Sequence, residues 1–181
     1  MFKKVLLSCT VLTFLLYGNF VFAAEFSSDV VNIINGKETD KGVIYVKNNL
    51  RRVESGTGDA SIVTIIDVNK KEGWLLIPGE KVYTKLDIGF FLNKDVAADK
   101  ANKKVVGRES LDGYKCTKTE YTHNNSAYGV LTQWYSDKLE FPVKIVHNMD
   151  GKEISKIEYK NIKMRKINDS LFSIPMGYKE K

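Results

Sequence analysis

Residues 43–83 constrain the fold more than any other stretch, because β-rich runs follow one another there with only short connections. VIYVK and LRRVE flank the Asn48-Asn49 turn, SIVTIIDV comes next, and WLLI follows a five-residue polar break that ends at Gly73. β-branched and aromatic residues at this density are typical of strands. Parallel neighbours would need crossovers of about a dozen residues or more. The stretch therefore predicts an antiparallel meander.

Pro78-Gly79 is predicted to form the next turn of this meander. Proline presets the first central position of a type II turn, and glycine supplies the positive φ that the second position needs. Residues 81–86 then run back as a further strand.

The central strands also predict a cover on both faces of the sheet. An antiparallel strand with one wet face needs only alternating apolar residues, whereas SIVTII and WLLI are apolar at consecutive positions. A strongly bent sheet covers one face by wrapping around its own core, and it leaves a concavity that a helix or a ligand fills. The alternative is an interior filled completely by side chains, as in small barrels.

Residues 1–23 are predicted to be a signal peptide. Lys3 and Lys4 supply a basic start, residues 5–22 form an almost continuous apolar run, and Val21-Phe22-Ala23 ends in a small residue that signal peptidase recognises. We therefore expect a periplasmic or secreted single domain over residues 24–181. A transmembrane anchor is the alternative, because the apolar run is nearly long enough to span a bilayer.

Cys116 is the only cysteine of the mature chain once Cys9 is removed, so no internal disulfide is expected. Stability must come from a core, which a chain of this length can form. Removal of Lys3 and Lys4 lowers the formal charge from +6 to +4. This mild excess fits solubility and peripheral contact with an anionic membrane, and it does not fit dedicated nucleic-acid binding.

The second half of the chain predicts four more strands, in the runs YKCTKTEYTH, YGVLTQWYS, FPVKIVHNM and KEISKIEYKNIKM. Asp112-Gly113 and Asp150-Gly151 are hairpin turn pairs, and no long crossover interrupts the series. One continuous antiparallel sheet is therefore expected. Residues 25–35 fit either a first strand or a short helix, and Phe172 lies where a last segment can dock.

Residues 87–108 form the one long segment without a strand pattern. A polar, alanine-containing run there fits a helix of two or three turns with Asp95 as its N-cap. Large apolar residues beside such a segment fit a lid over an apolar surface, and the alternative is a surface connection that fills its own core. The predicted lid residues are Ile88, Phe90, Phe91 and Leu92.

The residue types that carry chemistry do not form a recognisable pattern. His123 and His147 have no acidic or cysteine neighbour at ligand spacing. Cys116 has no partner histidine and fits a buried structural thiol better than a nucleophile. The sequence therefore predicts a protein that is not an enzyme, with no metal and no cofactor.

The order of these segments resembles the LolA-like superfamily of periplasmic lipoprotein carriers. The matching stretches are GVIYVKNNLRRVE, IVTIIDVNKKEGWLLIPGEKVY, GRESLDGYKCTKTEY, WYSDKLEFPVKIV and LFSIPMGY. The resemblance implies a mainly β fold, a curved antiparallel half-barrel with a short helical lid over its concave apolar face. The chain looks most like an uncharacterised secreted branch related to outer-membrane lipoprotein sorting. Arg51 and Arg52 lie near a functionally important arginine of the carriers, and the sequence does not assign that role to either.

The expected function is that of a periplasmic or cell-envelope binding or carrier protein for a hydrophobic ligand, either a lipid or a lipoprotein acyl chain. One sequence does not fix which alternate residues of each strand face inward. The predicted lining residues are Tyr45, Ile65, Trp74, Leu76, Tyr83, Trp134 and Ile145. The alternative is an envelope protein-interaction module with a filled core and no ligand, which would bind its protein partner at a sheet edge or through its exposed Lys/Arg face.

Overall fold

The computed structural model describes residues 25–88, 101–123 and 125–181. The predicted signal peptide lies outside these residues, and so do the lid residues Phe90, Phe91 and Leu92 and the predicted helix with its N-cap Asp95. These predictions stay untested.

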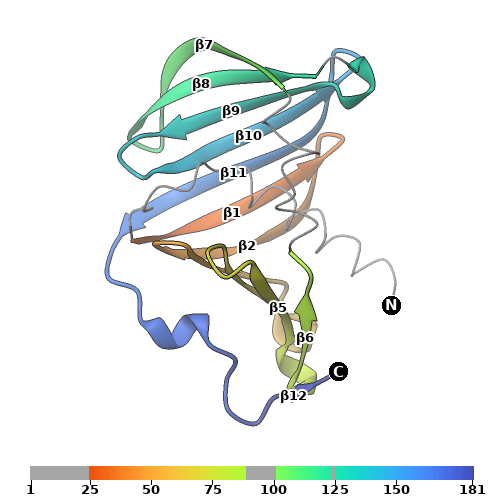
Figure 1. The fold of residues 1–181 in the computed structure, drawn as a ribbon, viewed down its shortest axis with the longest axis vertical. Helices are drawn as coiled ribbons and strands as arrows, with labels where there is room; N and C mark the ends of the chain where they lie inside the picture. Colours follow the sequence, from red (N-terminus) through yellow and green to blue (C-terminus); the bar gives the residue numbers. More distant parts are fainter. Residues whose placement is uncertain (1–24, 89–100, 124) are drawn as a thin grey trace.

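The described residues form one 12-stranded sheet (Figure 1). The first half of the chain supplies β1 (Phe26–Ile34), β2 (Lys37–Lys47), β3 (Leu50–Ser55), β4 (Ile62–Asp67), β5 (Glu72–Ile77) and β6 (Val82–Leu86). The second half supplies β7 (Asn102–Leu111), β8 (Tyr114–Thr122), β9 (Val130–Ser136), β10 (Phe141–Met149), β11 (Lys152–Met164) and β12 (Lys179–Glu180). Short 3-10 turns are η1 (Gly58–Ala60), η2 (Pro78–Glu80), η5 (Ser126–Tyr128) and η6 (Asp169–Phe172).

Two antiparallel meanders share this sheet, in the order β12-β6-β5-β4-β3-β2-β1-β11-β10-β9-β8-β7. The pairing of β1 with β11 joins the two meanders, and among the described strands only β12 pairs parallel, with β6. The predicted meander from β2 to β6 and the four later strands β8 to β11 are confirmed. The segment at residues 25–35 is a strand, β1, and not a helix.

Two hairpin turns form at the Asp-Gly pairs of the sequence. Asp112 and Gly113 both have positive φ (49° and 80°), and so do Asp150 and Gly151 (50° and 74°). Two-residue turns of this kind match the right-handed twist of the strands that they join. The predicted turns at these two pairs are confirmed.

The predicted type II turn at Pro78-Gly79 is wrong. These residues begin the 3-10 turn η2, in which the backbone N–H of Lys81 donates to the carbonyl of Pro78 at 3.2 Å. The left-handed residue is Lys81, with φ 51°, and Gly79 is not among the residues with positive φ. The loop extends one residue further than a type II turn, so the left-handed position falls at Lys81 and not at Gly79.

The prediction that residues 87–108 lack a strand is also wrong, because β7 begins at Asn102. β7 is an edge strand whose residues are mostly exposed, including Val105 at 62%. A strand with no buried face imposes no alternation of apolar and polar residues, so its sequence carries no period-2 signal.

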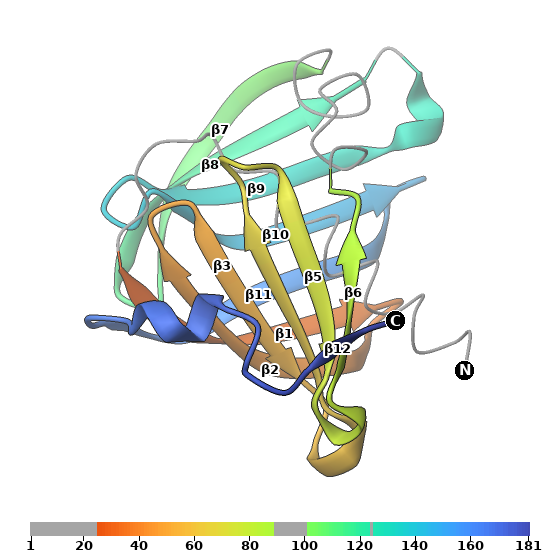
Figure 2. The ribbon, with the colours of Figure 1, turned by 60° about the horizontal axis from the view of Figure 1, so that its bottom comes forward.

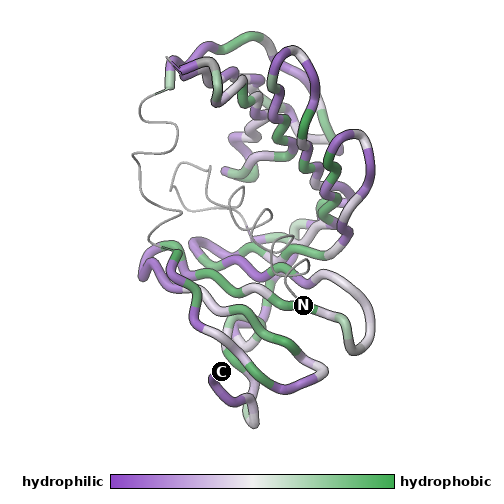
Figure 3. The backbone as a smooth tube through the Cα atoms, turned by 90° about the vertical axis from the view of Figure 1, so that its right-hand side faces the viewer, coloured by the Kyte–Doolittle hydropathy of each residue, from purple (hydrophilic) through white to green (hydrophobic). Residues whose placement is uncertain are grey.

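The sheet curls strongly, and side-chain contacts across it show how far. The Arg51 guanidinium on β3 lies 5.5 Å from the centre of the Phe141 ring on β10, although three strands separate β3 from β10 in the sheet. In a flat sheet these two strands would be roughly 19 Å apart, at about 4.8 Å per strand. The two meanders therefore form the arms of a C (Figures 2 and 3), with β7 and β12 at its two open edges. The predicted curved antiparallel half-barrel is confirmed.

The outer face of the β2–β6 arm is covered by the C-terminal segment (Figure 2). Phe172 on η6 and Ile167 pack in one cluster with Ile65 and Leu76. The Arg52 Nη1 also donates to the carbonyl of Leu171 at 2.9 Å. In β4 every residue after Ile62 is buried, so the predicted cover on both faces is confirmed.

Phe172→Ala tests this cover. Phe172 is only 8% exposed, and its truncation should lower the free energy of unfolding by about 3 kcal/mol, because the cavity would lie over the outer face of β4 and β5. Urea denaturation followed by circular dichroism measures the change. Met176→Ala, at a side chain that is fully exposed, is the matched control and should change the stability by less than about 0.5 kcal/mol. Equal stability of both variants would contradict the covering role of the segment.

Candidate functional site

The concave face of the curled sheet is the candidate site. Directly paired residues of neighbouring strands point to the same face, so strand register defines two rows across β2 to β6. The first row consists of Ile44, Val53, Thr64, Leu75 and Thr84. The second row consists of Val46, Arg51, Ile66, Gly73 and Leu86. Both rows are concave, because Arg51 reaches Phe141 across the sheet.

The centre of the concave face is apolar and aromatic. Phe26 on β1 and Tyr159 on β11 both contact the ring of Phe141, with ring centroids 5.3 and 5.0 Å apart and edge-to-face geometry. Ile145 and Ile157 are paired beside them and are buried. Ring edges over ring faces are favourable, so this cluster holds the bend between the two arms.

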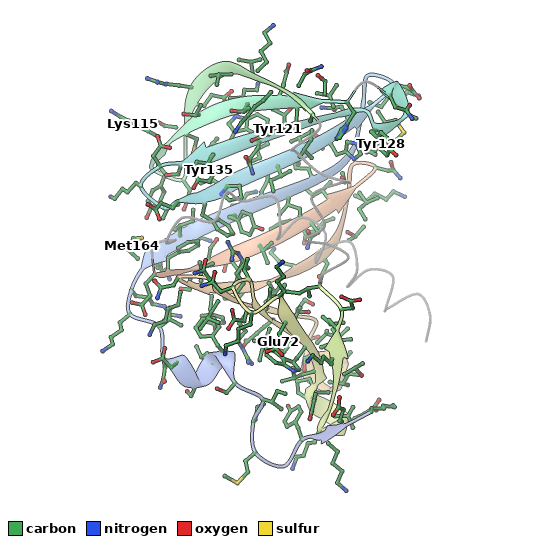
Figure 4. All side chains as sticks on the ribbon, in the orientation of Figure 1. Glu72, Lys115, Tyr121, Tyr128, Tyr135 and Met164 are labelled. Carbon is green, nitrogen blue, oxygen red and sulfur yellow. The ribbon has the colours of Figure 1, made fainter. Side chains whose placement is uncertain are left out.

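The two arms differ in polarity. On the β4–β6 arm, Leu75, Ile77 and Val82 stay half-buried on the concave side. On the β8–β9 arm, the hydroxyl of Tyr121 donates to the Gln133 Oε1 at 3.1 Å, and Tyr135 lies on the same face as Gln133 (Figure 4). Burial raises the pKa of both tyrosines, so they stay neutral hydroxyl groups. The concave face thus has one apolar arm and one arm with neutral polar groups.

Arg51 is the most unusual residue of the concave face. It is 5% exposed, and its Nε and Nη1 atoms have no hydrogen-bond partner in the described part of the chain. Within the described residues no carboxylate forms an ion pair with it, and the titratable groups that act on its charge are the phenols of Tyr159 and Tyr135. Burial lowers the pKa of Arg51 to about 10, so the side chain still carries its charge at neutral pH.

A buried charge without a partner destabilises the folded protein. The cost for an ion in a protein interior is several kcal/mol, and the stacking of Arg51 on Phe141 offsets only about 2 kcal/mol of it. Arg52, the next residue, lies on the outer face and is fully engaged, with its Nε 2.6 Å from Glu54 Oε1. The sequence did not distinguish the two arginines, and the strand pleat places them on opposite faces.

Six of the seven predicted lining residues are not on the concave face, and five of these six belong to strands β2 to β6. Tyr45, Ile65, Trp74, Leu76 and Tyr83 lie on the outer face, beneath the C-terminal segment. The lining prediction is therefore corrected for these five residues. Both faces of these strands are apolar, so the sequence could not show which alternate residues point inward.

The other predicted residues are divided between the two faces. Trp134 pairs with Lys144 and lies opposite Ile145, on the outer face, where the amines of Lys118 and Lys144 are 4.8 and 4.7 Å from its ring. Ile145 is on the concave face. Ile88, one of the predicted lid residues, is buried against Gly73 of the second concave row.

The two histidines and Cys116 have separate surroundings. Nε2 of His147 is 2.7 Å from the carbonyl of Tyr128, whose ring is 5.3 Å from that of His123 (Figure 4 labels Tyr128). Cys116 is buried, desolvation raises its pKa, and it lines a surface pocket of about 390 Å³.

The described part of the chain has no group of three or more His, Cys, Asp or Glu residues that could hold a metal ion. Within the same residues, no helix has the length and apolar character needed to span a bilayer.

Replacing Arg51 by methionine should stabilise the protein, which is the reverse of the usual effect of a core substitution. Arg51→Met removes an unpaired buried charge and keeps an apolar side chain of similar length, so the free energy of unfolding should rise by about 1–4 kcal/mol. Arg52→Met is the matched control on the outer face. It breaks the contacts to Glu54 and the carbonyl of Leu171, and it should lower stability by about 1–2 kcal/mol. Urea titrations measure both, and a strongly destabilised Arg51→Met would show that Arg51 has a partner in the folded protein.

Comparisons with solved structures agree with the curled sheet. An uncharacterized conserved protein from Thermus thermophilus superposes with a TM-score of 0.63 at 14% identity, covering 96% of this chain and 98% of that chain. MucB from Pseudomonas aeruginosa, in its complex with MucA, gives a TM-score of 0.57 at 14% identity, over 82% of this chain. A LolA superfamily protein from Nitrosomonas europaea is also similar, with a TM-score of 0.42 at 14% identity, covering 91% of this chain and 96% of that chain.

The likenesses to the Thermus thermophilus protein and to MucB show the fold alone, because the identities are low. The chain spans only about half the length of MucB, 55% in that complex. A search of curated proteins finds no match. Residues 30–140, well over half of the chain, match a family profile, and the chain therefore belongs to the family described as Domain of unknown function (DUF4412).

Proposed function

We propose that this protein is a binding or carrier protein of the cell envelope, which holds the acyl chain of a lipid or lipoprotein against its concave face. The observation that carries the proposal is the apolar surface of the β4–β6 arm. The outer face of strands β4 to β6 packs under the C-terminal segment. On their concave face, Leu75, Ile77 and Val82 stay half-buried in an open half-barrel. Concave apolar surfaces of this kind are where small hydrophobic ligands bind.

The proposed site differs from the set expected from the sequence. Ile145 and Ile88 remain in it, and the half-buried residues of β5 and β6 replace the five aromatic and aliphatic residues of the outer face. The lid formed by Phe90, Phe91 and Leu92 stays a prediction, and so do signal-peptide cleavage after Ala23 and a periplasmic or secreted location.

A protein-interaction module is the second candidate, and the exposed strand β7 favours it. β7 is the last strand of the sheet, and Val105 and Val106 on it are 62% and 38% exposed. An unpaired edge can accept an extended segment of a partner as an additional strand. MucB, which shares the fold, was solved in complex with the protein MucA.

Analysis of co-purified molecules separates the two candidates. We expect mass spectrometry of organic extracts, from protein purified without detergent, to find a lipid in near-stoichiometric amount. A sample that carries no lipid and that does not take up a fluorescent fatty acid would contradict the carrier function and favour the interaction module.

The variant Leu75→Gln tests whether the ligand binds on the concave face. Leu75 and Leu50 are half-buried leucines of the same arm, on opposite faces, so Leu50→Gln is the matched control. Loss of one apolar contact should weaken binding of a fluorescent fatty acid about tenfold in Leu75→Gln, and binding should change less than about twofold in Leu50→Gln. Fluorescence titration gives the two dissociation constants, and circular dichroism checks the fold. The opposite ranking would place the ligand on the outer face.

A further inference from the structure

Arg51 suggests which class of hydrophobic ligand the proposed site accepts. The guanidinium lies in the second concave row between Val46 and Ile66, and its Nε and Nη1 hydrogens have no acceptor. Buried donors in native proteins are almost always satisfied, so this one needs an explanation. The inference that follows rests on the proposed function and adds to it the chemistry of the ligand head.

Among the described residues no carboxylate forms an ion pair with Arg51. The buried Oε2 of Glu140 also has no hydrogen-bond partner, but its charge acts on Tyr135 and not on Arg51. Three other acidic residues are paired elsewhere. Glu54 binds Arg52 on the outer face, and Glu158 lies within 4.0 Å of three lysines on the outer face of β10 and β11. Asp67 binds Lys70. The groups that do surround Arg51 are the Phe141 ring and the phenols of Tyr135 and Tyr159, which burial keeps neutral. The local environment thus presents one positive charge, aromatic walls and neutral hydroxyl groups.

This environment is complementary to an oxyanion attached to an apolar chain. A guanidinium presents two parallel N–H donors that match a carboxylate or phosphate, and the low local dielectric strengthens the pair. The apolar residues of the two concave rows around Arg51 would contact the acyl or alkyl chain of the same molecule. A small inorganic anion would satisfy the charge but leave those rows uncovered.

We propose that Arg51 binds the anionic head of an amphiphilic ligand, a carboxylate or phosphate group joined to an acyl or alkyl chain, inside the concave face. The ligand supplies the counter-charge that the described residues lack, and the guanidinium selects charged amphiphiles over neutral ones.

The test compares ligands that differ only in the head. Dodecanoate, dodecyl phosphate and methyl dodecanoate compete for the protein against N-phenyl-1-naphthylamine, a neutral fluorescent reporter, near neutral pH. The wild type should bind dodecanoate or dodecyl phosphate about tenfold or more tightly than the methyl ester, since a charge-assisted pair is lost with the ester. Whichever of the two anions binds more tightly identifies the head group.

Variants assign this preference to one side chain. Arg51→Met should lose the preference for the charged ligands and keep the affinity for methyl dodecanoate within about twofold, and Arg51→Lys should retain part of the preference. Arg52→Met, on the outer face, should keep it in full.

Three results would overturn the proposal. Equal affinity of the wild type for dodecanoate, dodecyl phosphate and the ester would remove the anionic head from the ligand class. An undiminished preference in Arg51→Met would remove Arg51 from the site. Acetate or inorganic phosphate competing as well as their amphiphilic counterparts would show a simple anion site. Binding of all three amphiphiles with no selectivity leaves the carrier function intact, whereas binding of none contradicts both proposals.

Discussion

The burial of both faces of β4 is the constraint on which the rest of the structure depends. Five consecutive residues of β4 are buried, and no flat sheet with one wet face accommodates such a strand. The two faces are covered in different ways. The outer face packs under the C-terminal segment, and the inner face is closed by the curl of the sheet, which brings Phe26 against Phe141.

The same curl creates the electrostatic problem of the interior. In a flat sheet Arg51 on β3 would be far from β10. The curl brings this permanently charged side chain to the aromatic cluster around Phe141 on β10. The neighbouring Arg52 shows that the strand could have kept its positive charge on the outer face alone, where Glu54 and a backbone carbonyl bind it. A charge retained inside, at a cost to stability, is typical of a group that serves binding.

The sequence predicted the parts of this architecture that depend on local chemistry. The hairpin at Asp150-Gly151 follows from residues that tolerate positive φ, and the cover on both faces follows from consecutive apolar residues. Strand parity did not follow, because Ile65 and Ile66 are equally apolar and only tertiary contacts distinguish inside from outside. β7 was missed because an exposed edge strand has no pattern, and Arg51 was not separated from Arg52 because its isolation appears only once distant strands meet.

The junction between β1 and β11 has a consequence for folding. The hydroxyl of Ser28 donates to the carbonyl of Lys160, 132 positions further along the chain, and this pairing is the only link between the two meanders within the sheet order. Each meander can form from neighbouring strands as it is synthesised, but the half-barrel cannot close until β11 has emerged. Contacts of such sequence separation slow folding and leave strand edges exposed in the interval. Between the completion of the first six strands and the arrival of β11, the edge of β1 that will pair with β11 therefore stays exposed.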